Sequence, residues 1–168
     1  TTRYSLSNIL IGQTEKGMIR DGYYTLGREY ADLLAPEAVG TEAAQRIQAK
    51  LKLGKSRSGK FPVVFNPEVA RGLWSHLLGA LKGGALYQRS SFMLDKLGHH
   101  ILPKDISIIE DPFILKGLGS SNYDSDGVAT AKRTIVDQGK LDGYFLSGYS
   151  ARRLGMETTG NAGGIHNI

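Results

Sequence analysis

The chain contains no cysteine, which excludes disulfides, cysteine-based zinc clusters and cysteine nucleophiles within its 168 residues. It has no apolar run long enough to span a membrane, and its N-terminus shows no charged-then-apolar signal pattern. These absences are compatible with a cytoplasmic protein and predict no membrane contact. The chain begins without methionine and ends at His166-Asn167-Ile168, so we expect a piece of a longer protein.

Strong charge of one sign is also missing. The net charge is +5, the hydrophobic content 40% and the charged content 22%, as in ordinary soluble globular proteins. Lysine and arginine are spread along the chain, so a nucleic-acid partner is not favoured. Glycine is abundant, with 22 residues, which favours a β-rich or mixed architecture over a helical bundle.

The first part of the chain predicts a hairpin followed by a helix. Partial alternation indicates strands at 4–11 and 18–26 around a turn at 13–17. A helix is expected from Glu37 to Leu51, with Ala44, Ile47 and Leu51 on one side.

A basic, glycine- and serine-rich segment follows at 54–60 and reads as a linker. The alternative is a phosphate-binding loop, because Gly54-Lys55-Ser56 is part of that pattern. The full spacing is absent, however, and the segment follows a helix instead of a strand, so the linker is favoured.

The remaining residues alternate between short strands and two helices. Phe61–Phe65 predicts a short buried strand that runs into a helix capped by Asn66 and ended by Gly83-Gly84. Further elements are expected as follows: a strand at 106–109, a hairpin of 134–136 and 141–146 around a turn at 137–139, a short helix at 149–154 and a glycine-rich loop at 159–164.

The helix after Asn66 is the most informative segment. Pro67 suits its first position and Glu68 its positive end. Apolar residues recur every four positions and make one wide face, which predicts a helix packed as core. His76 lies at the edge of that face, and a lone histidine there is more often a packing residue than a metal ligand.

No other group forms a recognisable site. His99 and His100 are adjacent, so they point in different directions, whereas His166 could approach residues distant in sequence. Asp124-Ser125-Asp126-Gly127 resembles part of a calcium loop but lacks its remaining acidic positions, which favours a turn stabilised by aspartate side chains. Ser120, Ser147 and Ser150 have no sequence context that resembles a nucleophile elbow. Arg152-Arg153 could bind a carboxylate or phosphate, but solvated charges on a helix are commoner.

Taken together, an ordered series of segments resembles the TldD/PmbA metallopeptidase family, and more closely its PmbA branch, also called TldE. The resemblance covers most of Phe61 to Asn167. It is carried by these segments: PVVFNPEVARGLWSHLLGALKGGALYQRSSFMLDKLG, ILPKDISIIEDP, DSDGVATAKRTIVDQGKLDGYFLSGYSARRLG and TTGNAGGIHN.

The resemblance implies an α+β fold. Residues 1–53 would end an N-terminal α/β domain, 54–60 would be the linker, and 61–168 would begin a β-rich C-terminal domain with one buried helix. It also implies a cytoplasmic zinc metallopeptidase complex of a TldD-type and a PmbA-type subunit, which degrades or processes unfolded peptides. TldD-type subunits carry His-Glu-x-x-x-His on the helix described above, with a further zinc ligand downstream.

Carried over to this sequence, the first histidine of that motif falls on His76, which matches. The glutamate falls on Leu77 and the second histidine on Leu81. A leucine can neither activate water nor bind zinc, and one imidazole cannot hold a catalytic ion. His76 is therefore expected to be a relic position, with no catalytic, cofactor or metal residue here and with zinc only in a TldD-type partner.

The resulting expectation is a non-catalytic subunit that pairs with a TldD-type subunit or with itself and contacts peptide substrates. Two alternatives remain open. The chain could be a peptidase through an unrecognised site, or it could be a regulatory protein, in line with the family's older label as modulator of DNA gyrase.

Overall fold

The computed structural model describes residues 2–15, 17–51, 54 and 57–168, which form two compact units, Thr1–Pro62 and Val63–Ile168. Each unit is described by itself. Both combine helices with strands, so the expected α+β class is confirmed.

The first unit begins with a long antiparallel hairpin. Strands β1 (Tyr4–Thr14) and β2 (Gly17–Gly27) pair in register over their whole length. The predicted hairpin is confirmed, but the strands run farther than expected and leave two residues between them. Residue 16 of the predicted turn lies outside the described residues. Gly17 has a φ of 123°, which a glycine adopts without strain.

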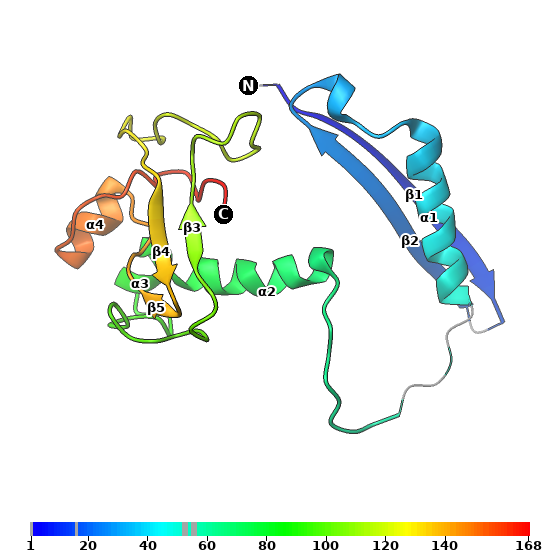
Figure 1. The fold of residues 1–168 in the computed structure, drawn as a ribbon, viewed down its shortest axis with the longest axis horizontal. Helices are drawn as coiled ribbons and strands as arrows, with labels where there is room; N and C mark the ends of the chain where they lie inside the picture. The colour runs from blue at the N-terminus through cyan, green and yellow to red at the C-terminus, as the bar shows by residue number, and fades with distance from the viewer. Residues whose placement is uncertain (1, 16, 52–53, 55–56) are drawn as a thin grey trace. The chain divides into compact units, whose positions relative to one another are not determined.

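A short 3-10 turn, η1 (Tyr30–Asp32), leads to helix α1 (Pro36–Leu51), which lies along one face of the hairpin (Figure 1). The helix is confirmed, but its buried stripe is Val39, Ala43 and Ile47. Leu51, which was expected on the same side as Ile47, is 46% exposed. These buried residues recur every four positions, so one narrow row faces the strands.

Between α1 and residue 66, the described residues form no helix or strand. Residues 55 and 56 of the predicted linker lie outside the described residues, and 57–60 are exposed. The predicted buried strand at 61–65 is wrong. All five residues are exposed, Val64 to 97%, because no strand in the described part of the chain pairs with them.

The second unit begins with helix α2 (Pro67–Ala80). Its predicted start is confirmed, since the Asn66 side chain accepts a hydrogen bond from the Glu68 amide at 2.9 Å and Pro67 follows the cap. Its predicted end is wrong. Lys82 is extended, and the glycines that were expected to stop the helix begin a new one, α3 (Gly83–Tyr87).

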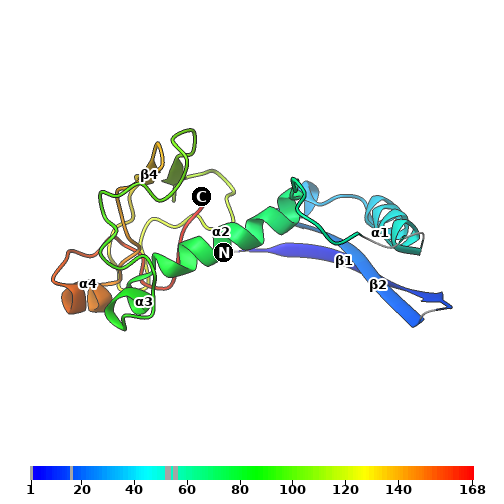
Figure 2. The ribbon, with the colours of Figure 1, turned by 90° about the horizontal axis from the view of Figure 1, so that it is seen from below.

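The break between α2 and α3 has a clear cause in the backbone of Phe145. The Phe145 amide donates to the Leu81 carbonyl at 3.1 Å, and the Phe145 carbonyl accepts from the Gly83 amide at 2.8 Å. Gly83 also lies so close to Ser150 and Leu146 that a Cβ at this position would collide with both side chains. Glycine is therefore required here for close approach, and α3 lies beside helix α4 (Gly148–Leu154; Figure 2).

A three-stranded antiparallel sheet, in the order β3-β4-β5, completes the unit: β3 (Ile108–Glu110), β4 (Arg133–Asp137) and β5 (Lys140–Leu141). The predicted turn is confirmed as a two-residue loop, Gln138-Gly139, with φ of 43° and 80°. The predicted strand 141–146 is wrong beyond Leu141. The amides of Asp142 and Gly143 both donate to the Ile135 carbonyl, which takes the chain out of the ladder.

The core of this unit lies between the sheet, the end of α2 and the two short helices. Its buried residues are Ala80, Leu81, Leu86, Met93, Ile108, Ile135, Val136, Leu141, Tyr144, Phe145, Leu146 and Ala151. Among the described residues, no helix has the length and apolar character that crossing a bilayer requires.

Candidate functional site

Helix α2 places the predicted relic histidine away from the core. His76 is exposed, and so are Val69 (61%), Leu73 (53%) and Trp74 (38%) on the preceding turns. Ala80, at 9% exposed, is the one buried residue of the helix. The expectation of a buried helix therefore holds only for its C-terminal end, where the chain enters the core.

Two leucines that stand at the zinc-motif positions occupy that C-terminal end. Leu81 is completely buried in the core, and Leu77 packs against it. Neither side chain has a donor atom for a metal, and His76 alone supplies one nitrogen. These residues do not fit a zinc ion. In the described part of the chain, no group of three or more His, Cys, Asp or Glu side chains could hold a metal.

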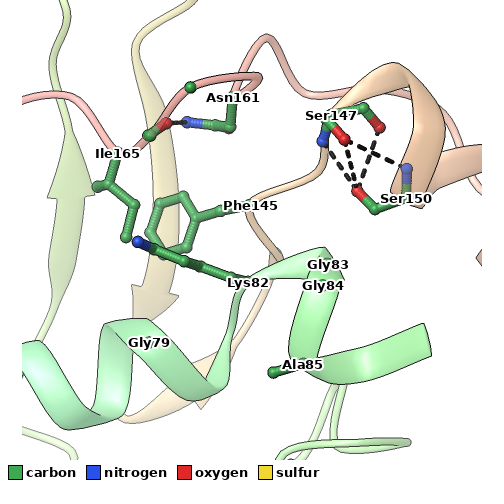
Figure 3. A pocket seen from close by; sticks show the side chains of 12 residues that line it. Gly79, Lys82, Gly83, Gly84, Ala85, Phe145, Ser147, Ser150, Asn161 and Ile165 are labelled. Atoms are coloured by element: carbon green, nitrogen blue, oxygen red, sulfur yellow. Dashed lines mark hydrogen bonds between the residues drawn. The ribbon is translucent and has the colours of Figure 1, made fainter. Parts of the chain in front are cut away.

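A pocket of about 410 Å³ opens next to the α2–α3 break (Figure 3). Three segments form it: the residues around the break, residues 145–150 at the start of α4, and the glycine-rich segment 161–165. The lining residues are Gly79, Lys82, Gly83, Gly84, Ala85, Phe145, Ser147, Ser150, Asn161, Gly163, Gly164 and Ile165. Such a volume is typical of small-ligand or peptide side-chain sites.

Behind the pocket lies a buried polar network centred on Glu110, which is 1% exposed. Arg133 Nη2 donates to Glu110 Oε2 at 2.7 Å and to Asn161 Oδ1 at 2.9 Å. Asn161 Nδ2 donates to Glu110 Oε1 at 2.7 Å, and the His166 amide donates to the same oxygen at 2.9 Å. The charges of Glu110 and Arg133 are thus paired within the protein, as buried charges require.

This network fixes the glycine-rich segment that lines the pocket. Asn161 also accepts from Thr159 Oγ1 at 2.7 Å and donates to the Gly164 carbonyl at 3.1 Å. Its amide group therefore binds the segment on both sides and holds it to β3 and β4. Hydrogen bonds therefore hold this wall of the pocket in place, although two of its residues, Gly163 and Gly164, are glycines.

The aspartate turn that the sequence predicts is confirmed. Asp124 is 6% exposed, and its Oδ1 accepts from the amides of Asp126 and Val128, both at 2.9 Å. Its Oδ2 accepts from the Ala162 amide at 2.9 Å. Both oxygens of this carboxylate thus accept hydrogen bonds from backbone amides. In a calcium loop the first aspartate would instead bind the ion, so the turn interpretation is favoured.

Burial raises the pKa of the Asp124 carboxyl, but the amides of Ala162, Val128 and Asp126 and the nearby His166 together lower it below its ordinary 3.8. A lowered pKa means that the folded state favours the charged form. The stabilisation is therefore fully present above pH 3.8 and is lost as pH falls through the lower folded value.

We expect Asp124→Asn to destabilise the second unit by about 1–3 kcal/mol at pH 7, because an amide NH₂ would face the Ala162 amide. The difference from the unchanged protein should shrink below pH 4. Urea unfolding between pH 7 and pH 3 measures both effects. Asp105→Asn, at an exposed loop position, is the matched control. A constant difference across this pH range would contradict the role of the charged carboxylate.

The histidines are not brought together. His166 lies at a second pocket of about 360 Å³, next to Asp124, and its ring nitrogens are each 3.1 Å from a carbonyl oxygen, of Gly119 and of Gly160. It does contact residues far away in sequence, as predicted. The backbone of His100 forms an isolated antiparallel bridge with Lys140, the first residue of β5. The His99 ring nitrogen Nδ1 lies 3.2 Å from the Leu97 carbonyl oxygen.

The serine candidates and Arg153 have structural partners. Ser147 and Ser150 form the capping box that begins α4, as the dashed lines of Figure 3 show. Ser120 Oγ donates to the Ile114 carbonyl at 2.6 Å. Arg153 lies over the Tyr87 ring at 6.0 Å. None of these contacts resembles a nucleophile with its base.

Sequence reasoning missed Lys82, Glu110, Arg133 and Asn161. A signal existed for two of them, because Glu110 directly follows Ile108-Ile109 and Arg133 stands two positions before Ile135-Val136. Opposite charges at the ends of two buried strands are an indication of an ion pair between them. Asn161 gave no such signal, since its partners lie 28 and 51 residues away.

Comparison with known families gives one match over most of the chain. A family described as the PmbA/TldA metallopeptidase C-terminal domain matches residues 58–168. Metalloprotease PmbA of Escherichia coli O157:H7 is 48% identical over 167 residues, which are 99% of this chain and 37% of that protein. A PmbA homologue of Haemophilus influenzae is 44% identical over the same shares. The chain thus spans under two fifths of these relatives.

Solved structures agree. TldE from Thermococcus kodakarensis superimposes with a TM-score of 0.77 at 27% identity, over 99% of this chain and 39% of that one. A Bacteroides thetaiotaomicron protein proposed to be a modulator of DNA gyrase gives a TM-score of 0.89 at 31% identity, over 98% and 37%. The fold described above is shared with both.

Proposed function

Because the chain belongs to the PmbA/TldA metallopeptidase family, we propose that it is part of a PmbA/TldE-like subunit of a cytoplasmic metallopeptidase complex. In this proposal the subunit is non-catalytic. It pairs with a zinc-bearing TldD-type subunit, supports that subunit and forms part of the wall around the peptide being processed.

The observation that carries the non-catalytic role is the packing of α2 at its C-terminal end. Leu81, at the position that would need the second histidine, is completely buried in the core. Leu77, at the position that would need the base, is partly buried and packs against that core. Water activation at this helix would require a carboxylate where Leu77 stands, and a leucine side chain cannot accept a proton. The helix therefore contributes packing and leaves the reaction to a partner.

A pair of measurements on the full-length protein tests this proposal. We expect less than one zinc ion for every ten molecules by elemental analysis, and no cleavage of an unfolded peptide by the protein alone. Cleavage should appear on addition of a TldD-type subunit. The partner alone is the matched control.

Stoichiometric zinc together with cleavage by the protein alone would favour the alternative, a peptidase with another site. A steep fall of DNA affinity with salt would favour a regulatory role on nucleic acid.

A further inference from the structure

The pocket at the α2–α3 break carries a single charge. Of its lining residues only Lys82 is ionised, and none is acidic. Within the described residues Lys82 has no ion-pair partner, unlike Lys50 and Lys132, which contact Asp21 and Asp111. The pocket therefore offers an ammonium group without a countercharge.

The backbone of Lys82 is fixed. Its amide donates to the Gly79 carbonyl at 3.2 Å, and the residue forms a parallel bridge with Phe145. In Figure 3 the side chain extends across the pocket past the Phe145 ring toward Ile165. Lys82 is exposed, so its ammonium group is accessible to a ligand that enters the pocket.

Two of the lining residues, Gly79 and Gly84, are glycines within helices. An added Cβ on Gly79 or Gly84 would meet no heavy atom within 4 Å, so contacts within the protein do not require glycine there. Both lie within helices, where alanine is more favourable. The missing side chains leave space in the pocket itself, which is consistent with a ligand that approaches the backbone.

We propose that this pocket binds a carboxylate of a peptide, with Lys82 as its cationic partner. One ammonium matches one carboxylate, whereas a phosphate dianion is usually held by several cationic or amide donors. Phe145 and Ile165 provide an apolar wall for the carbon atoms next to the carboxylate. The carboxylate can be the C-terminus of the peptide or an aspartate or glutamate side chain. That the ligand is a peptide rests on the proposed function.

Titration calorimetry on the full-length protein, without a partner subunit, tests the site independently of any cleavage. Three N-acetylated hexapeptides of neutral residues serve as probes: one with a free C-terminus, one amidated, and one amidated with an internal glutamate. We expect the fully neutral peptide to bind at least about tenfold more weakly than one of the charged peptides. Which charged peptide binds identifies the source of the carboxylate.

Three variants complete the test. Lys82→Met keeps the apolar stem and should weaken binding of the charged peptide about tenfold, whereas Lys104→Met, on an exposed loop, should not change it. Gly84→Ala should reduce binding, because the added methyl group fills part of the pocket. The melting temperature of this variant should equal or exceed that of the unchanged protein.

Equal affinity of all three peptides, or unchanged binding by Lys82→Met, would overturn the proposal. Binding of inorganic phosphate tighter than that of the charged peptides would overturn the assignment to carboxylate. These results would leave the non-catalytic role of the subunit untouched, since that role is judged by zinc content and cleavage.

Discussion

Replacing Arg133 with methionine is expected to destabilise the second unit by about 3–5 kcal/mol, because it leaves a buried carboxylate without its cation. Glu110 is 1% exposed, and Arg133 supplies the ion pair at 2.7 Å. Urea unfolding gives the loss of stability, and hydrogen exchange of the β3 and β4 amides shows where it occurs.

Two variants make this prediction specific. Lys132→Met removes the neighbouring cation, whose ion pair with Asp111 is exposed, and should have little effect. The double variant Glu110→Gln/Arg133→Met should be more stable than Arg133→Met alone, because it removes the unpaired charge. If Arg133→Met were as stable as Lys132→Met, the buried pair would have no structural role.

Writing the zinc motif back into α2 is expected to unfold the second unit before it creates a metal site. The double variant Leu77→Glu/Leu81→His places a polar ring where a leucine is completely buried. It should lose about 3–5 kcal/mol through lost apolar contacts and an unsatisfied polar group. Thermal unfolding, with and without added zinc, measures the change.

Leu77→Glu alone is the matched control. Leu77 is only partly buried, so this variant should lose less stability than the double variant. Zinc should raise the melting temperature of neither. A stable double variant that binds one zinc ion would show that the helix retains the geometry of a metal site, and would argue against a purely packing role for Leu81.

The parts of the fold that the sequence predicts are those determined by neighbouring residues. Asn66 and Pro67 begin α2 as expected, because a cap depends on two or three residues. The Gln138-Gly139 hairpin and the Asp124 turn are local in the same way. The candidate pocket was only partly predicted, through the glycine-rich loop after residue 159.

The wrong predictions depend on distant residues. Gly83 was expected to end a helix, but contacts with Phe145 and Ser150 make it begin one. Residues 61–65 have the composition of a buried strand, yet no strand in the described part of the chain pairs with them. Leu81 was correctly assigned to packing. The exposure of the first turns of α2 could not be predicted, because the period of the apolar residues shows which side of a helix is apolar but not whether another element covers it.

The partners of Glu110 have a consequence for how the chain folds during synthesis. They are contributed by Arg133, Asn161 and His166, which lie 23, 51 and 56 residues later. A chain still being made would carry this carboxylate without most of its partners until residue 166 had left the ribosome. The hairpin and α1 need no such wait, because their contacts are local. We therefore expect the hairpin and α1 to form their contacts before Glu110 has met Asn161 and His166.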